Sequence, residues 1–226
     1  MPDRGRITVL IPAKNEAASI AEVVKGASLH ADDVLVMDGG STDATGARAA
    51  EAGARVLEDR GRGKGRAIRA AIPHLAREVT VLMDADGSHD PADIPKLVAP
   101  ILEGEADHVS GSRLLGGSSE LHGGFDEWAR LAGSSFITAC INKRYRVRLS
   151  DSQNGFRAIK TELLRSLRLR SRHTTIEQEL IVRTLRRGLL VSEVPTHEYP
   201  RVAGSSHISV WKDGIRYVIS LVELMI

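Results

Sequence analysis

Two aspartates separated by one residue are the strongest chemical signal in the sequence. Asp84 and Asp86 directly follow Val79–Met83, an apolar run with the length and β-branched content of a buried strand. Two carboxylates that leave a strand together can hold one divalent cation, and hard oxygen ligands favour Mg²⁺ or Mn²⁺. The same residues, with Gly87 and Ser88 after them, are also typical of an ordinary turn between a strand and a helix. The neighbouring motifs therefore decide which interpretation holds.

Two other apolar runs also end in polar residues. Ile7–Ile11 leads into Asn15 and Glu16, and Val34–Met37 leads directly into Asp38. Ligands of open α/β sheets bind at the carboxyl ends of the strands, so these ends form a candidate site. Asp38 can accept hydrogen bonds from a nucleobase or a ribose hydroxyl. Alternatively, the polar residues near these ends only begin helices.

A basic, glycine-rich segment follows the strand expected at Ala54–Leu57. Arg60–Arg66 combines glycines, which allow close backbone approach, with cations that can meet a phosphate. It matches neither common nucleotide loop, because Lys64 is followed by Gly65 and the glycine period breaks at Arg66. These departures disfavour a P-loop NTPase and a dinucleotide-binding dehydrogenase, and a solvated basic loop is the alternative.

The elements that must position these residues alternate along the first half of the chain. This alternation predicts a doubly wound α/β fold with a mainly parallel sheet flanked by helices. The expected strands are 7–11, 34–37, 54–57, 79–83, 108–110 and 189–194. The expected helices are 17–29, 43–52, 65–75, 92–102, 127–143 and 176–187, with an amphipathic stretch from 208.

Composition narrows the function classes. The chain has 226 residues and a formal net charge of +2, and only 4% of its residues are aromatic, which argues against a nucleic-acid partner. Cys140 is the single cysteine, so neither an internal disulfide nor a cysteine-rich zinc site can form. The N-terminal residues lack the apolar core of a signal peptide, and no run is long enough to span a bilayer. A cytoplasmic protein is expected.

The last residues of the sequence form an apolar, amphipathic run. Residues 217–226 end without a capping glycine or a polar tail, which suggests either a truncation or a helix that ends on a membrane or a partner. With Lys212 and Arg216 beside the apolar stripe, the helix can lie in the headgroup region of a membrane. Core packing or a homodimer contact explains the same stripe.

Six motifs in order resemble family 2 glycosyltransferases of the GT-A fold, and within them the dolichol-phosphate mannosyltransferase-like group of polyprenyl-phosphate sugar transferases. The match covers about residues 7–207. Residues 1–207 are expected as one catalytic domain with an acceptor-side C-terminal elaboration, and residues 208–226 follow as the amphipathic helix. The motifs are Pro12–Glu16, Asp38–Thr45, Gly63–Gly65, Asp84–Asp86, Gly111–Arg113 and Asp151–Arg157.

The resemblance implies a nucleotide-sugar donor site with a metal ion on Asp84 and Asp86. The donor would be held by Pro12, Ala13, Asn15, Glu16, Asp38, Gly40, Lys64, Asp84, Ala85 and Asp86. The donor and acceptor phosphates would be surrounded by Arg113, Arg130, Ser134 and Arg157. Arg201 would begin a loop, reaching to His207, that closes over the donor. Glu177 and Glu179 would begin a helix that faces the sugar, although a capped surface helix is an alternative.

The function implied is inverting transfer of a hexose, mannose or glucose, from a nucleotide-diphosphate sugar such as GDP-mannose to polyprenyl or dolichyl phosphate at the cytoplasmic face of a membrane. A sugar or glycerate hydroxyl is the alternative acceptor, and it would need a base such as Asp151 or Glu177. A nucleotidyltransferase is the alternative from another class. Lys14, Gly39, Ser88 and His207 depart from the family's common residues, which leaves the donor's identity open.

Overall fold

A single mixed sheet organises the molecule. The computed structural model describes residues 3–59, 63–119, 125–203 and 210–225, with the side chains of 125–128 and 210–213 left out. The strands run in the order β3-β2-β1-β4-β6-β5-β7. β6 is antiparallel to both neighbours and the other pairs are parallel. The strands are β1 (Ile7–Ala13), β2 (Asp33–Asp38), β3 (Arg55–Glu58), β4 (Val79–Leu82), β5 (His108–Ser112), β6 (Arg157–Lys160) and β7 (Val191–Pro195).

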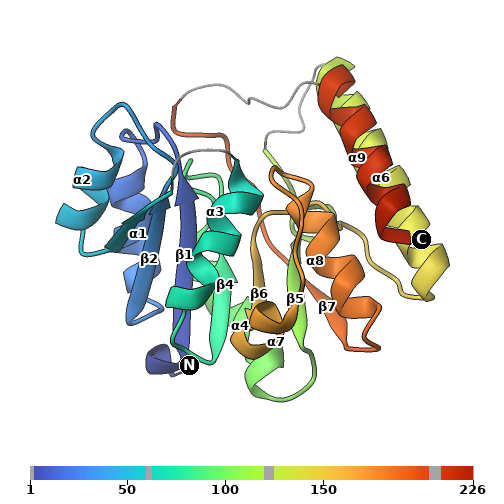
Figure 1. Cartoon of the computed structure of the whole chain (residues 1–226), viewed down its shortest axis with the longest axis horizontal. Coiled ribbons are helices and arrows are strands. Elements are labelled where there is room, and N and C mark those ends of the chain that lie inside the picture. The colour runs from blue at the N-terminus through green and yellow to red at the C-terminus, as the bar shows by residue number, and fades with distance from the viewer. Residues whose placement is uncertain (1–2, 60–62, 120–124, 204–209, 226) are drawn as a thin grey trace.

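Helices cover both faces of the sheet (Figure 1). The predicted mixed, mainly parallel α/β architecture is therefore confirmed. The α-helices are α1 (Ile20–Ser28), α2 (Thr45–Glu51), α3 (Lys64–Ala71), α4 (Ile94–Leu102), α5 (Arg113–Gly116), α6 (Phe125–Tyr145), α7 (Thr161–Ser166), α8 (Ile176–Leu185) and α9 (Val210–Met225). Short 3-10 turns cover Arg4–Arg6, Ile72–His74 and Pro91–Asp93.

Apolar side chains of the central strands are buried on both faces. Val9 and Ile11 of β1 belong to the core beneath α1 and α4, while Leu10 belongs to the core beneath α3, α7 and α8. This follows from the alternation of side chains along a strand, and it explains why such strands read as continuous apolar runs. The sheet is therefore held between two layers of helices, and this holds the carboxyl ends of its strands in place.

A pair of long helices stands at one end of the molecule. α6 and α9 lie side by side in Figure 1. They pack on each other and on α8 through a third cluster that includes Ile141, Ile181 and Leu221. The expected C-terminal amphipathic helix is thus α9, which begins at Val210. The domain boundary expected at residue 208 stays a prediction because 204–209 lie outside the described residues.

Three elements were not predicted from the sequence: β6, α5 and α7. β6 begins with Arg157 and ends with Lys160, so it lacks the apolar pattern of a central strand. The helix predicted over 65–75 ends earlier as an α-helix, since Pro73 belongs to the 3-10 turn that follows α3. Among the described residues, no helix is both long and apolar enough to cross a bilayer.

Candidate active site

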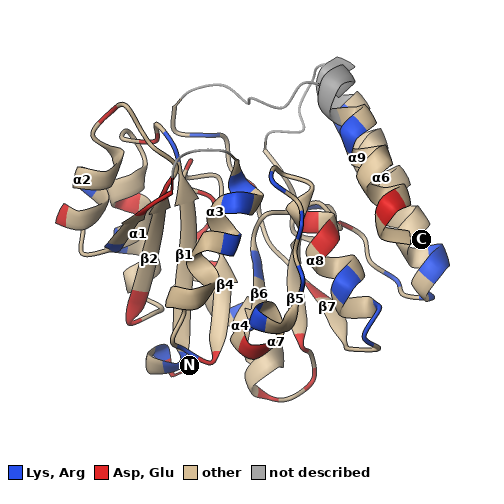
Figure 2. Ribbon diagram, in the orientation of Figure 1, with Lys and Arg blue, Asp and Glu red and all other residues tan. Residues whose placement is uncertain are grey.

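The three predicted strand ends meet at one edge of the sheet. β1 lies between β2 and β4, and both pairs are parallel, so their carboxyl ends point the same way. Ala13 pairs with Asp38 in the β1–β2 register, and the N–H of Gly39 donates to the Ala13 carbonyl over 2.8 Å. Figure 2 shows the basic start of α3 and the acidic start of α8 at this same edge. Pro12, Ala13, Asp38 and Asp84 thus border one site.

The Asp38 carboxylate shapes the turn after β2. Asp38 is 9% exposed and accepts hydrogen bonds from the Ser41 N–H (2.9 Å) and the Ser41 hydroxyl (2.7 Å) through Oδ1. Gly46 lies so close that a Cβ there would stand 2.9 Å from the other oxygen, Oδ2. Gly40 has a positive φ of 71°, which permits the tight turn. Asp38 is held at the strand end by its own loop.

Asn15 joins the loops that follow β1 and β2. Its side-chain oxygen accepts the Thr42 N–H over 2.8 Å, and its own N–H donates to the Ser41 hydroxyl over 2.9 Å. The Glu16 N–H donates to the Thr45 hydroxyl over 2.9 Å. α1 begins only at Ile20, so Asn15 and Glu16 connect two strand ends instead of beginning that helix. These two predicted donor-site residues do lie beside Asp38.

Lys64 lies between two carboxylates. Its ammonium nitrogen is 2.5 Å from Asp84 Oδ1 and 2.8 Å from Glu177 Oε1. The other Glu177 oxygen, Oε2, is buried without a hydrogen-bond partner among the described residues. A Cβ on Gly155 would stand 2.6 Å from Asp84 Oδ2 and 2.7 Å from Lys64 Nζ, so a larger residue there would have to displace this ion pair. Lys64, predicted near the donor, thus joins β4 to the first turn of α8.

The Lys64 ion pairs control the charge of Asp84. Burial alone would raise the pKa of this carboxyl, but attraction to Lys64, His89 and Arg201 outweighs burial and lowers the pKa to about 2. The pKa of Lys64 is raised above its ordinary value because the attraction of Asp84 and Glu177 exceeds the cost of its burial. Asp84 is therefore an anion at neutral pH, as a metal ligand must be.

This depressed pKa makes stability depend on pH. The carboxyl of an unfolded aspartate titrates at about 3.9. The lowered pKa of Asp84 in the folded protein therefore contributes about 2 kcal/mol to the free energy of unfolding, and this contribution is fully present above that pH. The contribution is lost as the pH falls through about 2, because both states are then protonated. We expect urea unfolding at a series of pH values to show this loss in the wild-type protein. Asp84→Asn should lack it, while Asp90→Asn should keep it; identical profiles for all three proteins would contradict the assignment.

Asp86 pairs with a different cationic side chain, that of Arg201. Arg201 donates to Asp86 Oδ2 from Nε (3.0 Å) and from the terminal nitrogen (2.7 Å), and it also lies 3.5 Å from Glu16. Ser88 donates to Asp86 Oδ1 from its N–H and its hydroxyl. The Val202 N–H donates to the Asp86 carbonyl over 3.0 Å. The segment around Arg201 therefore covers the aspartate turn, and its predicted continuation to His207 lies outside the described residues.

His89 supports the aspartate turn and was not singled out in the sequence. Its Nδ1 accepts the backbone N–H of Asp84 over 3.2 Å, and its ring stacks on Phe156 with centroids 4.8 Å apart. Burial lowers the pKa of His89 against the attraction of the neighbouring aspartates. Ser19 likewise donates to the carbonyl of Ala85 over 2.7 Å. A lone histidine after a turn gives no sequence signal for this role, because the Phe156 contact is long-range.

Gly63 and Gly65, beside Lys64, serve chain packing. A Cβ on Gly63 would stand 2.4 Å from the Arg172 carbonyl oxygen, and one on Gly65 would stand 2.5 Å from that of Ser171. The space beside both glycines is therefore filled by backbone, where the sequence suggested room for a phosphate. Arg66 forms an ion pair with Asp59 over 3.1 Å, and Arg60, Gly61 and Arg62 lie outside the described residues.

Arg113 and Asp151 form a buried ion pair. Arg113 donates to both carboxylate oxygens, over 2.6 and 3.1 Å, and also reaches Glu198 over 3.3 Å. Burial alone would raise the pKa of Asp151. The attraction of Arg113 and the hydrogen bonds to the carboxylate outweigh burial, so the pKa is lowered. A carboxylate so engaged is a weak general base, which disfavours that alternative role for Asp151. Its position instead suits orientation of Arg113.

Arg157 lies beneath the site and not in it. It is 0% exposed, and its guanidinium donates to the carbonyls of Glu177 and Asn154. Burial lowers its pKa against the attraction of Glu177, Asp151 and Asp84. Arg157 therefore has backbone partners, and its predicted contact with a phosphate stays a prediction. It acts as a buried positive charge beneath three carboxylates.

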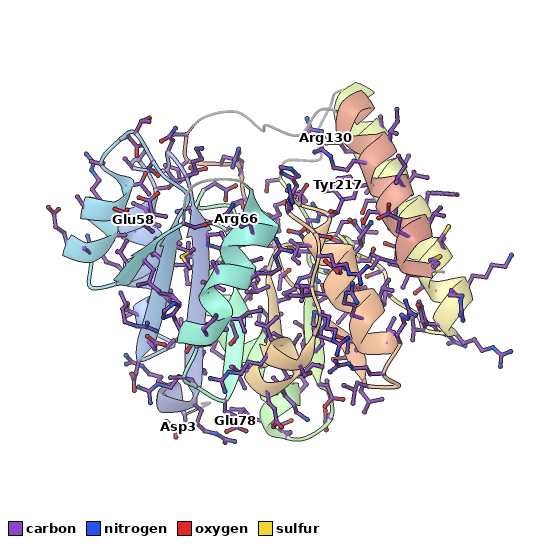
Figure 3. All side chains as sticks on the ribbon, in the orientation of Figure 1. Asp3, Glu58, Arg66, Glu78, Arg130 and Tyr217 are labelled. Atoms are coloured by element: carbon purple, nitrogen blue, oxygen red, sulfur yellow. The ribbon has the colours of Figure 1, made fainter. Side chains whose placement is uncertain are left out.

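The remaining predicted residues lie apart from this cluster. Arg130 and Ser134 are one turn apart on α6, and Figure 3 labels Arg130 at the upper end of that helix. Within the described part of the chain, neither forms a hydrogen bond or ion pair with the aspartates. Glu179 also faces away: its carboxylate accepts the N–H groups of Arg170 and Ser171 and pairs with Arg183.

The donor set fits a hard divalent cation. Asp84 and Asp86 present ionised oxygens two residues apart, and Mg²⁺ is commonly bound by one or two carboxylates with substrate phosphates completing the shell. No group of three or more histidine, cysteine, aspartate or glutamate ligands occurs among the described residues. Asp84 and Asp86 already pair with Lys64 and Arg201. A metal ion would therefore have to bind beside these two side chains or displace them.

Comparison with known proteins identifies the family. The sequence profile described as glycosyl transferase family 2 matches residues 8–168. Glycosyltransferase AglJ of Haloferax volcanii is 34% identical over 220 residues, covering 95% of this chain and 70% of AglJ. A dolichyl-phosphate hexose transferase of that organism is 30% identical over 225 residues, covering 96% of this chain and 93% of the relative.

A solved structure agrees in fold. Glucosyl-3-phosphoglycerate synthase from Mycobacterium tuberculosis, in complex with phosphoglyceric acid, matches with a TM-score of 0.77 and 25% identity, over 98% of this chain and 80% of that one. The profile covers well over half of the chain, and it includes Asp38, Asp84 and Asp86 at the strand ends and Lys64 at the start of α3. The chain is therefore an enzyme that belongs to glycosyl transferase family 2.

Proposed function

We propose that the protein transfers a hexose from a nucleotide-diphosphate sugar to a polyprenyl or dolichyl phosphate, with inversion at the anomeric carbon. The observation that carries this is the pair Asp84 and Asp86 at the strand edge, next to Asp38. The name of the dolichyl-phosphate hexose transferase relative supports the acceptor class. We propose mannose or glucose as the sugar and GDP-mannose as the first donor to test.

The proposed donor site follows the strand edge. Asp38, whose Oδ1 is engaged by Ser41, keeps its second oxygen for the base or ribose of the nucleotide. Asn15 and Gly40 form the loops around it, and Pro12 and Ala13 line the adjacent strand. Asp84, Ala85 and Asp86 then hold the diphosphate and a Mg²⁺ or Mn²⁺ ion, which stabilises the negative charge of the leaving group. Glu16 and Lys64 border the same space.

In the proposed reaction, an acceptor phosphate oxygen attacks the anomeric carbon from the face opposite the diphosphate. A phosphate monoester is already an anion near neutral pH, so it needs aiming more than deprotonation. Arg113, fixed by Asp151, is proposed to aim it, with Arg130 and Ser134 on the facing helix α6. Arg201 is proposed to leave Asp86 for the donor phosphates when donor and metal bind.

A soluble acceptor is the second candidate. It is favoured by the structural neighbour that binds phosphoglyceric acid. A hydroxyl acceptor requires a base, and Glu177 is the better candidate because its Oε2 is buried without a partner among the described residues. Membership of family 2 sets the nucleotidyltransferase alternative aside.

We also propose that α9 lies on the cytoplasmic face of a membrane. Ile215, Val218, Ile219 and Val222 are 65, 45, 54 and 53% exposed and share one side of the helix. An apolar stripe on an amphipathic helix can enter the headgroup region, where a lipid acceptor presents its phosphate. A homodimer contact would cover the same stripe, and sedimentation without lipid distinguishes the two. The side chain of Lys212, expected beside this stripe, is outside those described.

The test begins with donor binding. A panel of GDP-, UDP-, ADP- and CDP-sugars, each with and without Mn²⁺, should raise the melting temperature for one nucleotide only in the presence of metal. That donor is then offered polyprenyl phosphate and 3-phosphoglycerate separately. Transfer to the lipid alone supports the proposal, and transfer to phosphoglycerate alone would replace it with the second candidate. A metal-independent shift would contradict the role of the aspartates.

A further inference from the structure

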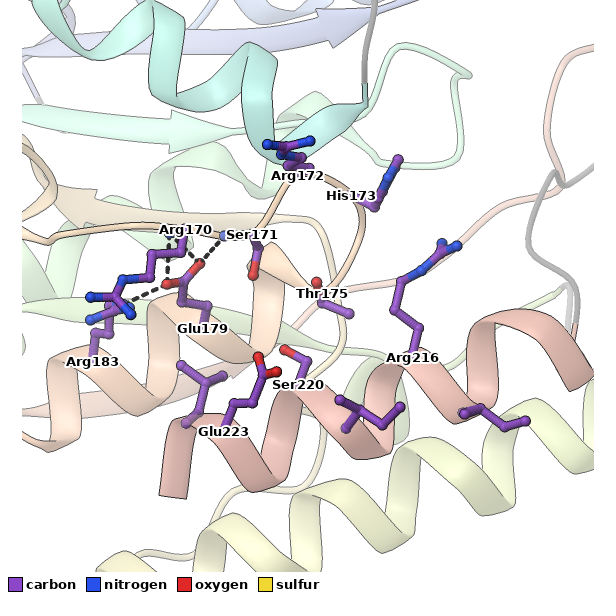
Figure 4. Close-up of a pocket in the computed structure, with 13 residues that line it drawn as sticks. Arg170, Ser171, Arg172, His173, Thr175, Glu179, Arg183, Arg216, Ser220 and Glu223 are labelled. Carbon is purple, nitrogen blue, oxygen red and sulfur yellow. Dashed lines mark hydrogen bonds and ion pairs between the residues drawn. The ribbon is translucent and has the colours of Figure 1, made fainter. Parts of the chain in front are cut away.

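We propose that a pocket between residues 170–175 and α9 binds the phosphate headgroup of an anionic membrane phospholipid. The pocket encloses about 580 Å³ and is lined on one side by Arg170, Ser171, Arg172 and His173, and on the other by α9. Figure 4 shows this segment across the pocket from α9, with the Ser171 side chain on the side of α9 and the Arg172 side chain beside α3. None of its lining residues belongs to the proposed donor site. The inference rests on the proposed membrane position of α9 and adds the lipid class.

The charges of the pocket favour an anion, because its lining has four arginines (Arg170, Arg172, Arg183 and Arg216) against two carboxylates (Glu179 and Glu223). Arg170 and Arg172 are exposed, and neither guanidinium has an ion-pair partner within the described ranges. Glu179 is already engaged by Arg183 and by the N–H groups of Arg170 and Ser171, so its charge is offset. Guanidinium groups match the geometry of phosphate oxygens, so each of these exposed arginines can bind an anionic headgroup.

The opposite wall is suited to an acyl chain. Ile215 and Ile219 line the pocket and are 65 and 54% exposed, and the buried Leu224 lines it too. These two isoleucines also belong to the outward apolar stripe of α9. A lipid whose phosphate meets Arg170 or Arg172 could therefore extend its chains along the surface that we place in the bilayer. A free phosphate would use only the basic wall.

The pocket also adjoins the start of α3. Its wall at Ser171 and Arg172 packs against Gly65 and Gly63, on either side of Lys64, and the Arg66 N–H donates to the Arg172 carbonyl over 3.2 Å. A headgroup bound there would hold this segment, and with it the Lys64 side of the donor site, toward the membrane surface. That orientation suits an acceptor whose phosphate lies at the surface.

Vesicle co-sedimentation tests the proposal. The wild-type protein should bind vesicles of phosphatidylcholine with phosphatidylglycerol at least tenfold more tightly than vesicles of phosphatidylcholine alone. The double variant Arg170→Gln/Arg172→Gln should lose about 25-fold in affinity for the anionic vesicles, since each surface arginine contributes about fivefold. Lys25→Gln/Arg77→Gln removes the same charge from exposed positions away from the pocket and should change binding about twofold or less.

Each other outcome overturns the inference in a distinct way. An equal loss of vesicle affinity in both double variants would mean that the protein is attracted by its overall surface charge and not by this pocket. Equal binding of the wild-type protein to anionic and neutral vesicles would mean that α9 binds the membrane without a headgroup pocket. Binding that required polyprenyl phosphate in neutral vesicles would assign the pocket to the acceptor instead. Absence of all vesicle binding would overturn the membrane proposal too, while the donor-induced melting shift would still stand. Unchanged melting temperatures of the variants establish that they fold.

Discussion

Asp86→Asn is expected to lower kcat/KM for sugar transfer about 1000-fold, a loss comparable with removal of a principal group that stabilises transition-state charge. The amide keeps an oxygen that can accept from Ser88, so the turn after β4 should survive. It loses the charge that now pairs with Arg201 and that we assign to the metal ion. Steady-state rates over a range of Mn²⁺ concentrations measure the effect, and thermal unfolding reports on the fold.

Asp90→Asn is the matched control for this substitution. Asp90 is the same residue type in the same segment, but its carboxylate accepts the Ala92 N–H at the start of a 3-10 turn. Its replacement should change activity only a few-fold. A comparable loss in both variants, or retention of a tenth of the activity by Asp86→Asn, would contradict the metal assignment.

Arg201→Met separates the metal role of Asp86 from its ion pair. If Asp86 acts only by holding Arg201, the two single variants and the double variant should lose the same activity. If Asp86 also binds the metal, the Asp86→Asn variant should lose more and should alone need a higher Mn²⁺ concentration. The structure makes this comparison necessary because Asp86 and Arg201 are joined by two hydrogen bonds.

The strand ends of the site could be predicted from the sequence for a simple physical reason. Strands buried on both faces are continuous apolar runs, so the first polar residue after each run marks its end. Asp38 and Asp84 were located in this way, and parallel pairing of β1 with both neighbours brings them to one edge. The same rule failed for β6, which is buried but begins with an arginine.

The partners of the site residues could not be predicted, because they are set by tertiary contacts. Lys64 was expected near the nucleotide from the family motif, but its ion pairs to Asp84 and Glu177 depend on how α3 and α8 pack on the sheet. Arg157 belongs to a motif implied to meet phosphates, yet its strand places it in the core. The motifs thus locate these residues along the chain, but they do not determine what each residue contacts.

Lys64→Met is expected to destabilise the protein by about 3 to 5 kcal/mol, the usual cost of removing one partner from a buried ion pair. The substitution leaves Asp84 and Glu177 without their shared cation, and their side chains are 30 and 6% exposed. For a chain of 226 residues this corresponds to a fall of roughly 10 °C in melting temperature. Calorimetry at neutral pH measures it directly.

The pH dependence of Lys64→Met distinguishes charge repulsion from lost packing. In the wild-type protein, the lowered pKa of Asp84 means that acid removes stability. In the variant, the partly exposed Asp84 and the buried Glu177 have no cation between them, which favours uptake of a proton, so stability should rise as the pH falls from 7 to about 5. Lys64→Met/Glu177→Gln removes the repulsion and should recover much of the loss at neutral pH.

Lys25→Met provides the comparison at the surface. Lys25 pairs with Glu22, but the two side chains are 61 and 79% exposed, and such pairs contribute about 0 to 1 kcal/mol. A melting temperature of Lys64→Met within about 2 °C of the wild type would show that the Lys64 pairs contribute no more than this exposed one. Loss of stability that the second substitution fails to recover would assign the effect to packing. Recovery of stability without recovery of donor binding would instead show that Lys64 and Glu177 serve the reaction as well as the fold.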